Sequence, residues 1–450
     1  MAIIGRRRKR GLSTTQIIAC GFLISMIIGM VLLMLPVSSK DGTFTNPVDA
    51  LFTATTSVCV TGLTTVSTAE HWSVFGQIVI MILIQFGGLG IVTFTTAILL
   101  IASKRITLKE RLLIKDAYNL NSLNGLVKLT KKILKGTVVC ELCGALLYSF
   151  VFVKDYGAWG IFYSIFNAVS AFCNAGMDLL GNNSLGLYRD NFIVNTVTML
   201  LIILGGLGFP VWWDLVKNLK KKKKRRFLLH TKLVLTVTAI LIFGGMLLIL
   251  FIEYNNPDTL GSLSFPKKVQ AAMFQSVTTR TAGFYTIPQE NFTDASAFIS
   301  LILMFIGGSP SGTAGGVKTV TVAMIILTAY AIVKNKRDTE VFGRSISEQN
   351  VRKGIAVFVI SFAVLLLSMG ALSIVERADF LDTLYECVSA LATVGLSRGI
   401  TAQLGTVGKI IIIVTMYIGR IGPISLALFF NANMTQKDVK HYPVADIQVG

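Results

Sequence analysis

Charged residues are scarce in this sequence. Only 14% of its 450 residues are Asp, Glu, Lys or Arg, whereas 53% are hydrophobic, and the mean hydropathy is +0.68. Soluble domains carry about 25% charged residues, so the composition excludes a soluble protein and indicates one that crosses a membrane several times. The net charge of +19 does not indicate nucleic-acid binding, because the basic residues gather in short loops between apolar runs.

The sequence also lacks the residue clusters that metal centres and catalytic sites need. Its three histidines, His71, His230 and His441, are scattered and form no metal constellation. The six cysteines lie in or beside apolar segments, and we predict that they are small buried hydrophobic residues. Cys140-x-x-Cys143 has no second pair, which argues against a zinc or redox role. No catalytic cluster is evident, so an enzyme is not expected.

What the sequence does contain is one plan repeated four times at intervals of about 110 residues. In each repeat a short helical pattern leads into a polar stretch that ends in a small or β-branched residue and a glycine. The stretches are Thr-Thr-Ser-Val-Cys-Val-Thr-Gly at 55–62, Ser-Ala-Phe-Cys-Asn-Ala-Gly at 170–176, Val-Thr-Thr-Arg-Thr-Ala-Gly at 277–283 and Ala-Leu-Ala-Thr-Val-Gly at 390–395.

The repeats predict an all-α polytopic membrane protein built of four units around a pseudo-fourfold pore. Each unit has a spanning helix, a pore half-helix, a filter loop and a second spanning helix, which makes eight full spans. The spans are expected at 17–35, 74–102, 133–153, 192–215, 228–252, 298–332, 354–375 and 407–430. The units are expected at 1–103 with the N-terminus, 104–217, 218–335, and 336–450 with the C-terminal tail.

Charge in the loops predicts the orientation. The loops at 104–135, 217–232 and 334–353 are dense in Lys and Arg, whereas the opposite loops hold most of the acidic residues. The positive-inside rule therefore predicts that both termini are cytoplasmic and that the half-helices enter from outside. The first apolar run is expected to be a retained anchor rather than a cleaved signal peptide. The basic run 220–226 is interpreted as a topological signal, and a docking site for anionic lipid or an acidic partner is the alternative.

Non-helical backbone survives at membrane depth only if it is buried in protein or lines a watery cavity. Four such loops satisfy this condition if they meet on one axis, where their carbonyl oxygens replace the hydration shell of a cation. The alternative is that each glycine only permits a tight turn. The predicted filter residues carry no carboxylate; they are Val60, Thr61, Gly62, Asn174, Ala175, Gly176, Thr281, Ala282, Gly283, Thr393, Val394 and Gly395. Arg280 is expected to point away from the axis and to pair with Glu386 or Asp382.

The second span of the third unit is interrupted at 307–318 by five glycines and a proline, which cannot hold a continuous helix. A phosphate-binding loop is excluded, because Val317 separates Gly316 from Lys318 and no strand precedes the stretch. A static kink and a mobile loop in a permeation path remain, and we favour the mobile loop. The predicted gate residues are Gly307, Gly308, Ser309, Ser311, Gly312, Thr313, Gly315, Gly316 and, in the fourth unit, Arg420.

With these motifs the chain resembles the membrane subunit of the Trk/Ktr/HKT superfamily of potassium transporters, and most of all the Ktr-type (KtrB-like) subunit. The resemblance extends over about residues 17–430 and is most distinctive at 170–176 and 277–283. Met177, where Phe is expected, and Ala392, where glycine is common, depart from the family pattern. These departures leave the class unchanged and bear only on fine selectivity.

The resemblance implies potassium uptake at the bacterial plasma membrane, with K+ as the transported ion and often stimulation by Na+ as a co-ion. It implies a homodimer, surrounded by membrane lipids, and a separate cytosolic ring of KtrA-like subunits. The regulatory nucleotide is expected on that partner chain, because this chain has no soluble nucleotide-binding domain and no cofactor of its own. It does not imply nucleic-acid binding.

Two rival functions belong to other classes. A coupled secondary transporter of an organic solute needs carboxylates near the midplane, but the main candidate, Glu141, lies close to the basic cytoplasmic edge. A membrane enzyme needs the catalytic cluster that is not evident.

Overall fold

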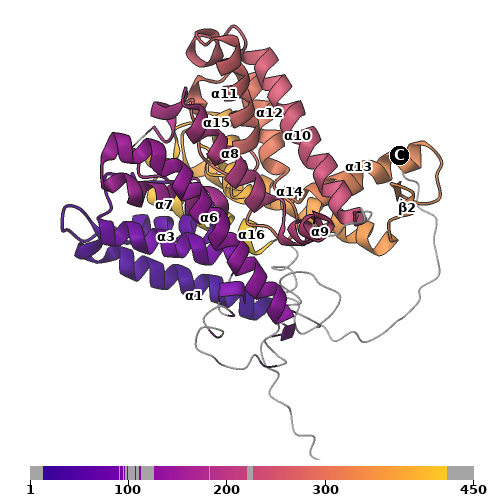
Figure 1. The fold of residues 1–450 in the computed structure, drawn as a ribbon, viewed down its shortest axis with the longest axis horizontal. Helices are drawn as coiled ribbons and strands as arrows, with labels where there is room; N and C mark the ends of the chain where they lie inside the picture. Colours follow the sequence, from indigo (N-terminus) through magenta and orange to yellow (C-terminus); the bar gives the residue numbers. More distant parts are fainter. Residues whose placement is uncertain are drawn as a thin grey trace, which may run out of the picture.

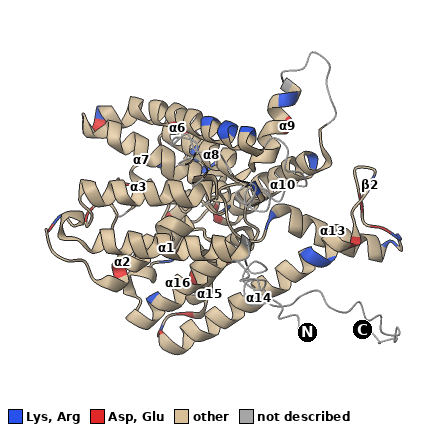
Figure 2. Cartoon of the chain, turned by 90° about the horizontal axis from the view of Figure 1, so that it is seen from below, with Lys and Arg blue, Asp and Glu red and all other residues tan. Residues whose placement is uncertain are grey.

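The computed structural model describes residues 14–90, 92–94, 126–181, 183–219 and 227–422, with positions 96, 99, 107, 111 and 112 between them. In these residues the protein is almost entirely helical (Figure 1). The strands described there form one small hairpin of β1 (Glu340–Val341) and β2 (Arg344–Ser345). Charged residues lie mostly at helix ends and in loops, whereas the helix bodies are largely uncharged (Figure 2).

The helices follow one another in groups that begin with a long helix and continue with two shorter ones. The first two groups are α1 (Thr14–Met34), α2 (Pro47–Cys59), α3 (Val74–Leu89), then α6 (Leu126–Tyr156), α7 (Trp159–Cys173), α8 (Phe192–Gly206). The last two are α10 (Leu229–Glu253), α11 (Phe265–Thr278), α12 (Asp294–Phe305), then α14 (Glu348–Val375), α15 (Phe380–Ala392), α16 (Thr406–Ile421). Two further helices, α9 (Phe209–Leu219) and α13 (Thr319–Val333), follow α8 and α12.

Contacts between helices close these groups into a ring. The third helix of each group packs against the second helix of the next group: α3 on α7, α8 on α11, α12 on α15, and α16 on α2. The last of these contacts joins the end of the described chain to its beginning. The second helices therefore lie at the centre, and in α2 every residue from Phe52 to Cys59 is buried.

Glycines allow the third helices to approach the ends of the second helices closely. A Cβ built on Gly87, Gly205 or Gly419 would lie 2.0 Å from a backbone carbonyl oxygen, and those oxygens belong to Val58, Phe172 and Leu391. No other residue type fits at such a distance. Small residues at these positions thus permit close helix packing.

The number of spans stays a prediction. Among the described residues α1, α6, α10 and α14 are long and apolar enough to cross a membrane, and α8 with α9 makes a fifth if that bent pair is one span. Helices α3, α12 and α13 are apolar but shorter. The predicted spans at 74–102 and 407–430 extend beyond the described residues. The N-terminal 13 residues, the basic run 220–226 and the C-terminal tail lie outside them.

The prediction of an unbroken second span in the second unit, 192–215, is wrong. Helix α8 ends at Gly206, and α9 begins at Phe209 after a bend of 100°. Gly208 has a φ of +87°, which ends the helix, and the Phe209 N–H donates to the carbonyl of Ser311 at 3.0 Å. The interruption predicted in the third unit is present, because α12 ends at Phe305 and α13 begins only at Thr319.

The cysteine prediction holds for half of the six residues. Cys59, Cys173 and Cys387 are buried as expected, but Cys20 and Cys140 are only partly buried and Cys143 is exposed on the outer surface of α6. A small apolar side chain at that position can face lipid, because hydrocarbon tails accept it as readily as a protein core does.

Candidate functional site

The four glycine loops share one backbone conformation. Two residues before each glycine, the chain takes the left-handed region, with φ between 52° and 67°, and the residues are Val60, Asn174, Thr281 and Thr393. Three of these four are β-branched, a type that avoids this region. Residues in such strained backbone conformations persist only where the surrounding structure holds them in place, and they cluster at functional sites.

The loops meet in a closed ring. A Cβ built on Gly62 would lie 2.6 Å from the carbonyl oxygen of Ala175, in the next loop along the chain. The same contact joins the second loop to the third and the third to the fourth, and Gly395 closes the ring onto the carbonyl of Thr61. The other contacting pairs are Gly176 with Ala282 and Gly283 with Val394, each at 2.6 Å. The structure thus brings together the residues predicted to form the filter.

Buried hydroxyls behind the loops hold three of them in place. Thr56 Oγ1 accepts the N–H of Gly62 at 2.9 Å, and Ser389 Oγ accepts the N–H of Gly395 at 3.0 Å. In the second loop, Ser170 Oγ accepts the N–H of Met177 at 3.1 Å. The third loop differs, because there the Thr278 hydroxyl donates to the carbonyl of Phe284.

Several polar groups in the ring have no hydrogen-bond partner among the described residues. They are the hydroxyls of Thr61, Thr281 and Thr393 and the side-chain nitrogen of Asn174, all buried. Buried polar groups are normally paired, so each exception calls for an explanation such as water or an ion. A ring that holds hydrated or partly hydrated cations supplies such partners.

A cavity lies on each side of the ring. The first, named the outer cavity after the predicted orientation, is about 360 Å³ and is lined by all four ring glycines and by Asp178 and Glu290. Burial raises the pKa of Asp178 to about 6, although the Leu180 N–H and Ser184 bond to its carboxylate and oppose this shift. The inner one, about 410 Å³, is lined by part of the 307–316 loop, by Lys318 and by Arg420.

The 307–316 loop is tied at its base and along its length. Gly307 and Val317 are joined by an N–H to carbonyl bond of 3.0 Å. Farther along, Ser309 N–H donates to Gly206 at 2.9 Å and Thr313 N–H to Gly205 at 3.1 Å. The loop therefore rests on the broken end of α8, the feature that sequence reasoning missed.

Arg420 joins this loop to the first group of helices. Its guanidinium donates to the carbonyl of Thr313 at 2.7 Å and also to the carbonyl of Gly87. Arg420 therefore contacts a backbone carbonyl of the predicted gate loop. The Thr313 hydroxyl is used elsewhere, because it donates to the Phe172 carbonyl at 3.2 Å and to Asn174 Oδ1 at 3.3 Å.

The pairing predicted for Arg280 is wrong. Asp382 instead pairs with Arg398, whose Nε lies 2.7 Å from the Asp382 carboxylate. Glu386 accepts hydrogen bonds from the Ser397 and Thr401 hydroxyls. Within the described part of the chain Arg280 has no ion pair, and its buried Nε has no hydrogen-bond partner.

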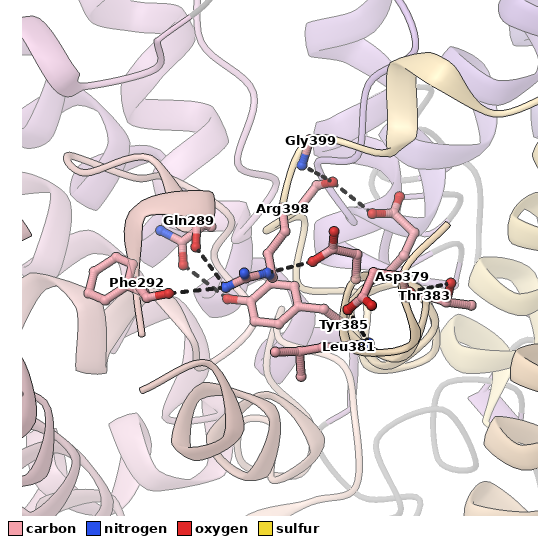
Figure 3. A network of polar contacts seen from close by, with 11 residues as sticks. Gln289, Phe292, Asp379, Leu381, Thr383, Tyr385, Arg398 and Gly399 are labelled. Atoms are coloured by element: carbon pink, nitrogen blue, oxygen red, sulfur yellow. Dashed lines mark hydrogen bonds and ion pairs between the residues drawn. The ribbon is translucent and has the colours of Figure 1, made fainter. Parts of the chain in front are cut away.

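Sequence reasoning missed the network around Arg398. This side chain also donates to the carbonyls of Gln289 and Phe292, both at 3.3 Å, so it joins the loop of the third group to α15 (Figure 3). Tyr385 in α15 adds a bond of 2.9 Å to Gln289 Oε1. A positive residue three positions after the fourth ring glycine was the available signal.

Comparison with known proteins agrees with this architecture. Residues 10–442 match the family TrkH, described as "Cation transport protein". The potassium/sodium uptake protein NtpJ of Enterococcus hirae is 41% identical, with both chains fully covered. The Ktr system potassium uptake protein B of Bacillus subtilis is 42% identical over 97% of this chain and 96% of its own.

A solved structure extends the likeness to the fold. The potassium transporter TrkH of Vibrio parahaemolyticus matches with a TM-score of 0.73 at 17% identity, covering 94% of this chain and 86% of its own. Its sequence has diverged far more than its helix arrangement. With the family match over nearly all of its length, the chain belongs to the TrkH family of cation transport proteins, which are multi-pass membrane transporters and not enzymes.

Proposed function

We propose that this protein takes up potassium across the bacterial plasma membrane through a channel-like pore whose selectivity filter is the ring of glycine loops. The observation that carries the proposal is the closed sequence of contacts in which each ring glycine meets a carbonyl of the following loop. Carbonyl oxygens arranged around an axis replace the water of a weakly hydrated cation. The four helix groups then act as four pore units within one chain.

The electrostatics around the ring favour a cation. The second helices α2, α7 and α15 end at the ring with their C-termini, which carry a partial negative charge. The outer cavity adds Asp178 and Glu290, and no Lys or Arg is among the described residues that line it. A cation is therefore concentrated at the outer mouth and then bound by backbone oxygens.

Below the filter, the 307–316 loop and Arg420 are proposed to act as the gate. The loop and a partly buried guanidinium line the inner cavity, so bulk and positive charge both oppose passage of a cation. The glycines let the loop move aside when the helix that follows it is pulled. The competing interpretation is a static kink with Arg420 as a structural anchor.

The partners are proposed from the relatives. Three of the similar proteins are named as parts of a Ktr system, which implies further components. We infer a homodimer and a KtrA-like cytosolic ring that binds nucleotide, with both termini on the cytoplasmic side and with Na+ as a co-ion. Each chain would hold a complete pore, so the dimer serves regulation rather than construction of the path.

Uptake of radioactive Rb+ into liposomes tests the function. We expect Rb+ uptake that K+ inhibits by competition. This uptake should proceed without any organic solute. A coupled transporter of an organic solute would instead show solute uptake that depends on an ion gradient. The candidate carboxylate for that rival, Glu141, bonds to Gln85 at 3.2 Å and is not among the described residues lining either cavity.

A further inference from the structure

Lys318 bonds to the loop that it follows. Its ammonium donates to the carbonyl of Ala314 at 2.7 Å and to the carbonyl of Gly315 at 3.0 Å. All three residues line the inner cavity. An ammonium group is therefore coordinated by two backbone carbonyls below the ring, in the way that a filter coordinates a permeating cation.

The electrostatic surroundings of this ammonium are unfavourable apart from the two carbonyls. Lys318 occupies the N-cap of α13, where the helix dipole places positive charge. Arg420 lines the same cavity, and no Asp or Glu is among the described residues of its wall. The carbonyls of Ala314 and Gly315 thus offset the charge of Lys318, and they are sites with a strong preference for a cation.

The carbonyl pair lies directly beneath the ring. Gly315 has no room for a Cβ, because Thr393 Oγ1 and the carbonyl of Ala392 lie against it, the latter at 2.8 Å. Thr393 is the left-handed residue of the fourth filter loop, and its hydroxyl has no partner among the described residues. A cation that leaves the ring on this side meets the carbonyls of the loop next.

We propose that the carbonyls of Ala314 and Gly315 form an inner binding site for a monovalent cation, and that the Lys318 ammonium occupies this site as a tethered competitor. Water in the cavity completes the coordination when K+ is bound. When Lys318 is displaced, the blocked position becomes a binding site on the permeation path of the cation. This inference rests on the proposed conduction of K+.

Equilibrium dialysis with radioactive Rb+ on the purified chain in detergent tests the site. Lys318→Met removes the ammonium and is expected to bind one more Rb+ per chain than the wild type. Lys318→Arg keeps a cation there and is expected to bind the wild-type amount. Lys334→Met, at the exposed far end of α13, is the matched control and should not differ from the wild type.

Equal Rb+ binding by the wild type and Lys318→Met would overturn the inner site while leaving the filter intact. Absence of Rb+ binding by the wild type would count against the proposed function itself. If Lys318→Met does not fold, Lys318→Gln replaces it, since its side chain is polar and uncharged and ends one bond short of the lysine nitrogen. The same gain of one Rb+ is then expected.

Discussion

Val60, Thr281 and Thr393 each hold a β-branched side chain at positive φ. Such a conformation costs about 1–3 kcal/mol per residue, and the packing around the ring must offset that cost. The sequence predicted that these residues belong to loops, because they interrupt helical patterns before a glycine. It did not predict their strain, which depends on contacts between loops about 110 residues apart in the chain.

Gly62→Ser tests one quadrant of the proposed filter. Gly62 has a φ of +102°, and its added Cβ would lie 2.6 Å from the Ala175 carbonyl. The carbonyl must move, so the preference for Rb+ over Na+ in liposome uptake should fall roughly tenfold, equivalent to about 1.4 kcal/mol. Unaltered fluxes of both ions would remove Gly62 from the filter.

Gly42→Ser is the matched control for that substitution. Gly42 also has a positive φ, of +66°, but a Cβ there would meet nothing within 4 Å. It should carry the backbone strain of the change without disturbing a carbonyl. Its Rb+ and Na+ uptake is expected to equal that of the wild type.

The carboxyl group of Asp178 leads to a prediction of how Rb+ uptake depends on external pH. Burial raises the pKa of this carboxyl group to about 6, so it is charged above that pH and neutral below it. The outer cavity therefore loses attraction for cations as the pH falls, and Rb+ uptake at low Rb+ should decline through about pH 6. Asp178→Asn should take up Rb+ at the reduced rate and lose this pH step, whereas exposed Asp41→Asn should keep it.

At the scale of elements, the two broken helices show how far the sequence predicts helix boundaries. The break between α12 and α13 was predictable because glycine and proline exclude a helix there. The break between α8 and α9 was missed although Gly205, Gly206, Gly208 and Pro210 give a similar signal there. Gly208 ends the helix at positive φ, and the bond from Phe209 to Ser311, a tertiary contact that hydropathy does not record, holds the bend.

Shortening the loop within residues 309–314 tests the gate. Without it the inner cavity loses its obstruction, so Rb+ flux should rise and depend less on the regulatory partner. A rise of roughly tenfold corresponds to about 1.4 kcal/mol of lost barrier. A shortened variant that folds, inserts and conducts no faster than the parent would favour the static kink.

Arg420→Ala is expected to act in the same direction but more weakly, because the loop remains. The substitution removes the bonds to Thr313 and Gly87 that hold the loop across the cavity. Exposed Arg352, which pairs only with Glu348 on its own helix among the described residues, supplies the control Arg352→Ala. Equal flux from both variants would leave Arg420 as a structural anchor.

At the scale of the whole molecule, the repeat in the sequence was enough to predict a ring of four loops. The order of contacts from α3 on α7 to α16 on α2 follows from that repeat. The ion pairs were not predictable, as the partner of Asp382 shows. Arg398 pairs with Asp382 although the two lie 16 residues apart in the chain. Arg280 makes no ion pair among the described residues.

The surface proposed to be cytoplasmic leads to the prediction about the partner. The basic run 220–226 and the tail 436–450 lie outside the described residues, and we expect both to contact the regulatory ring. Neutralising the run and deleting the tail should abolish co-purification with that ring while Rb+ uptake by the chain alone persists. Neutralising Lys40 and Lys267, which are predicted to lie on the opposite side of the membrane, is the control. Undiminished co-purification of the first variant would exclude this surface.

The central claim is that one ring of four glycine loops binds the transported ion. Crystals grown in Rb+ in place of K+ allow the ion to be located by anomalous scattering. The account predicts Rb+ on the axis between Gly62, Gly176, Gly283 and Gly395, within coordination distance of the loop carbonyls. Rb+ bound elsewhere in the protein with none inside the ring would contradict it.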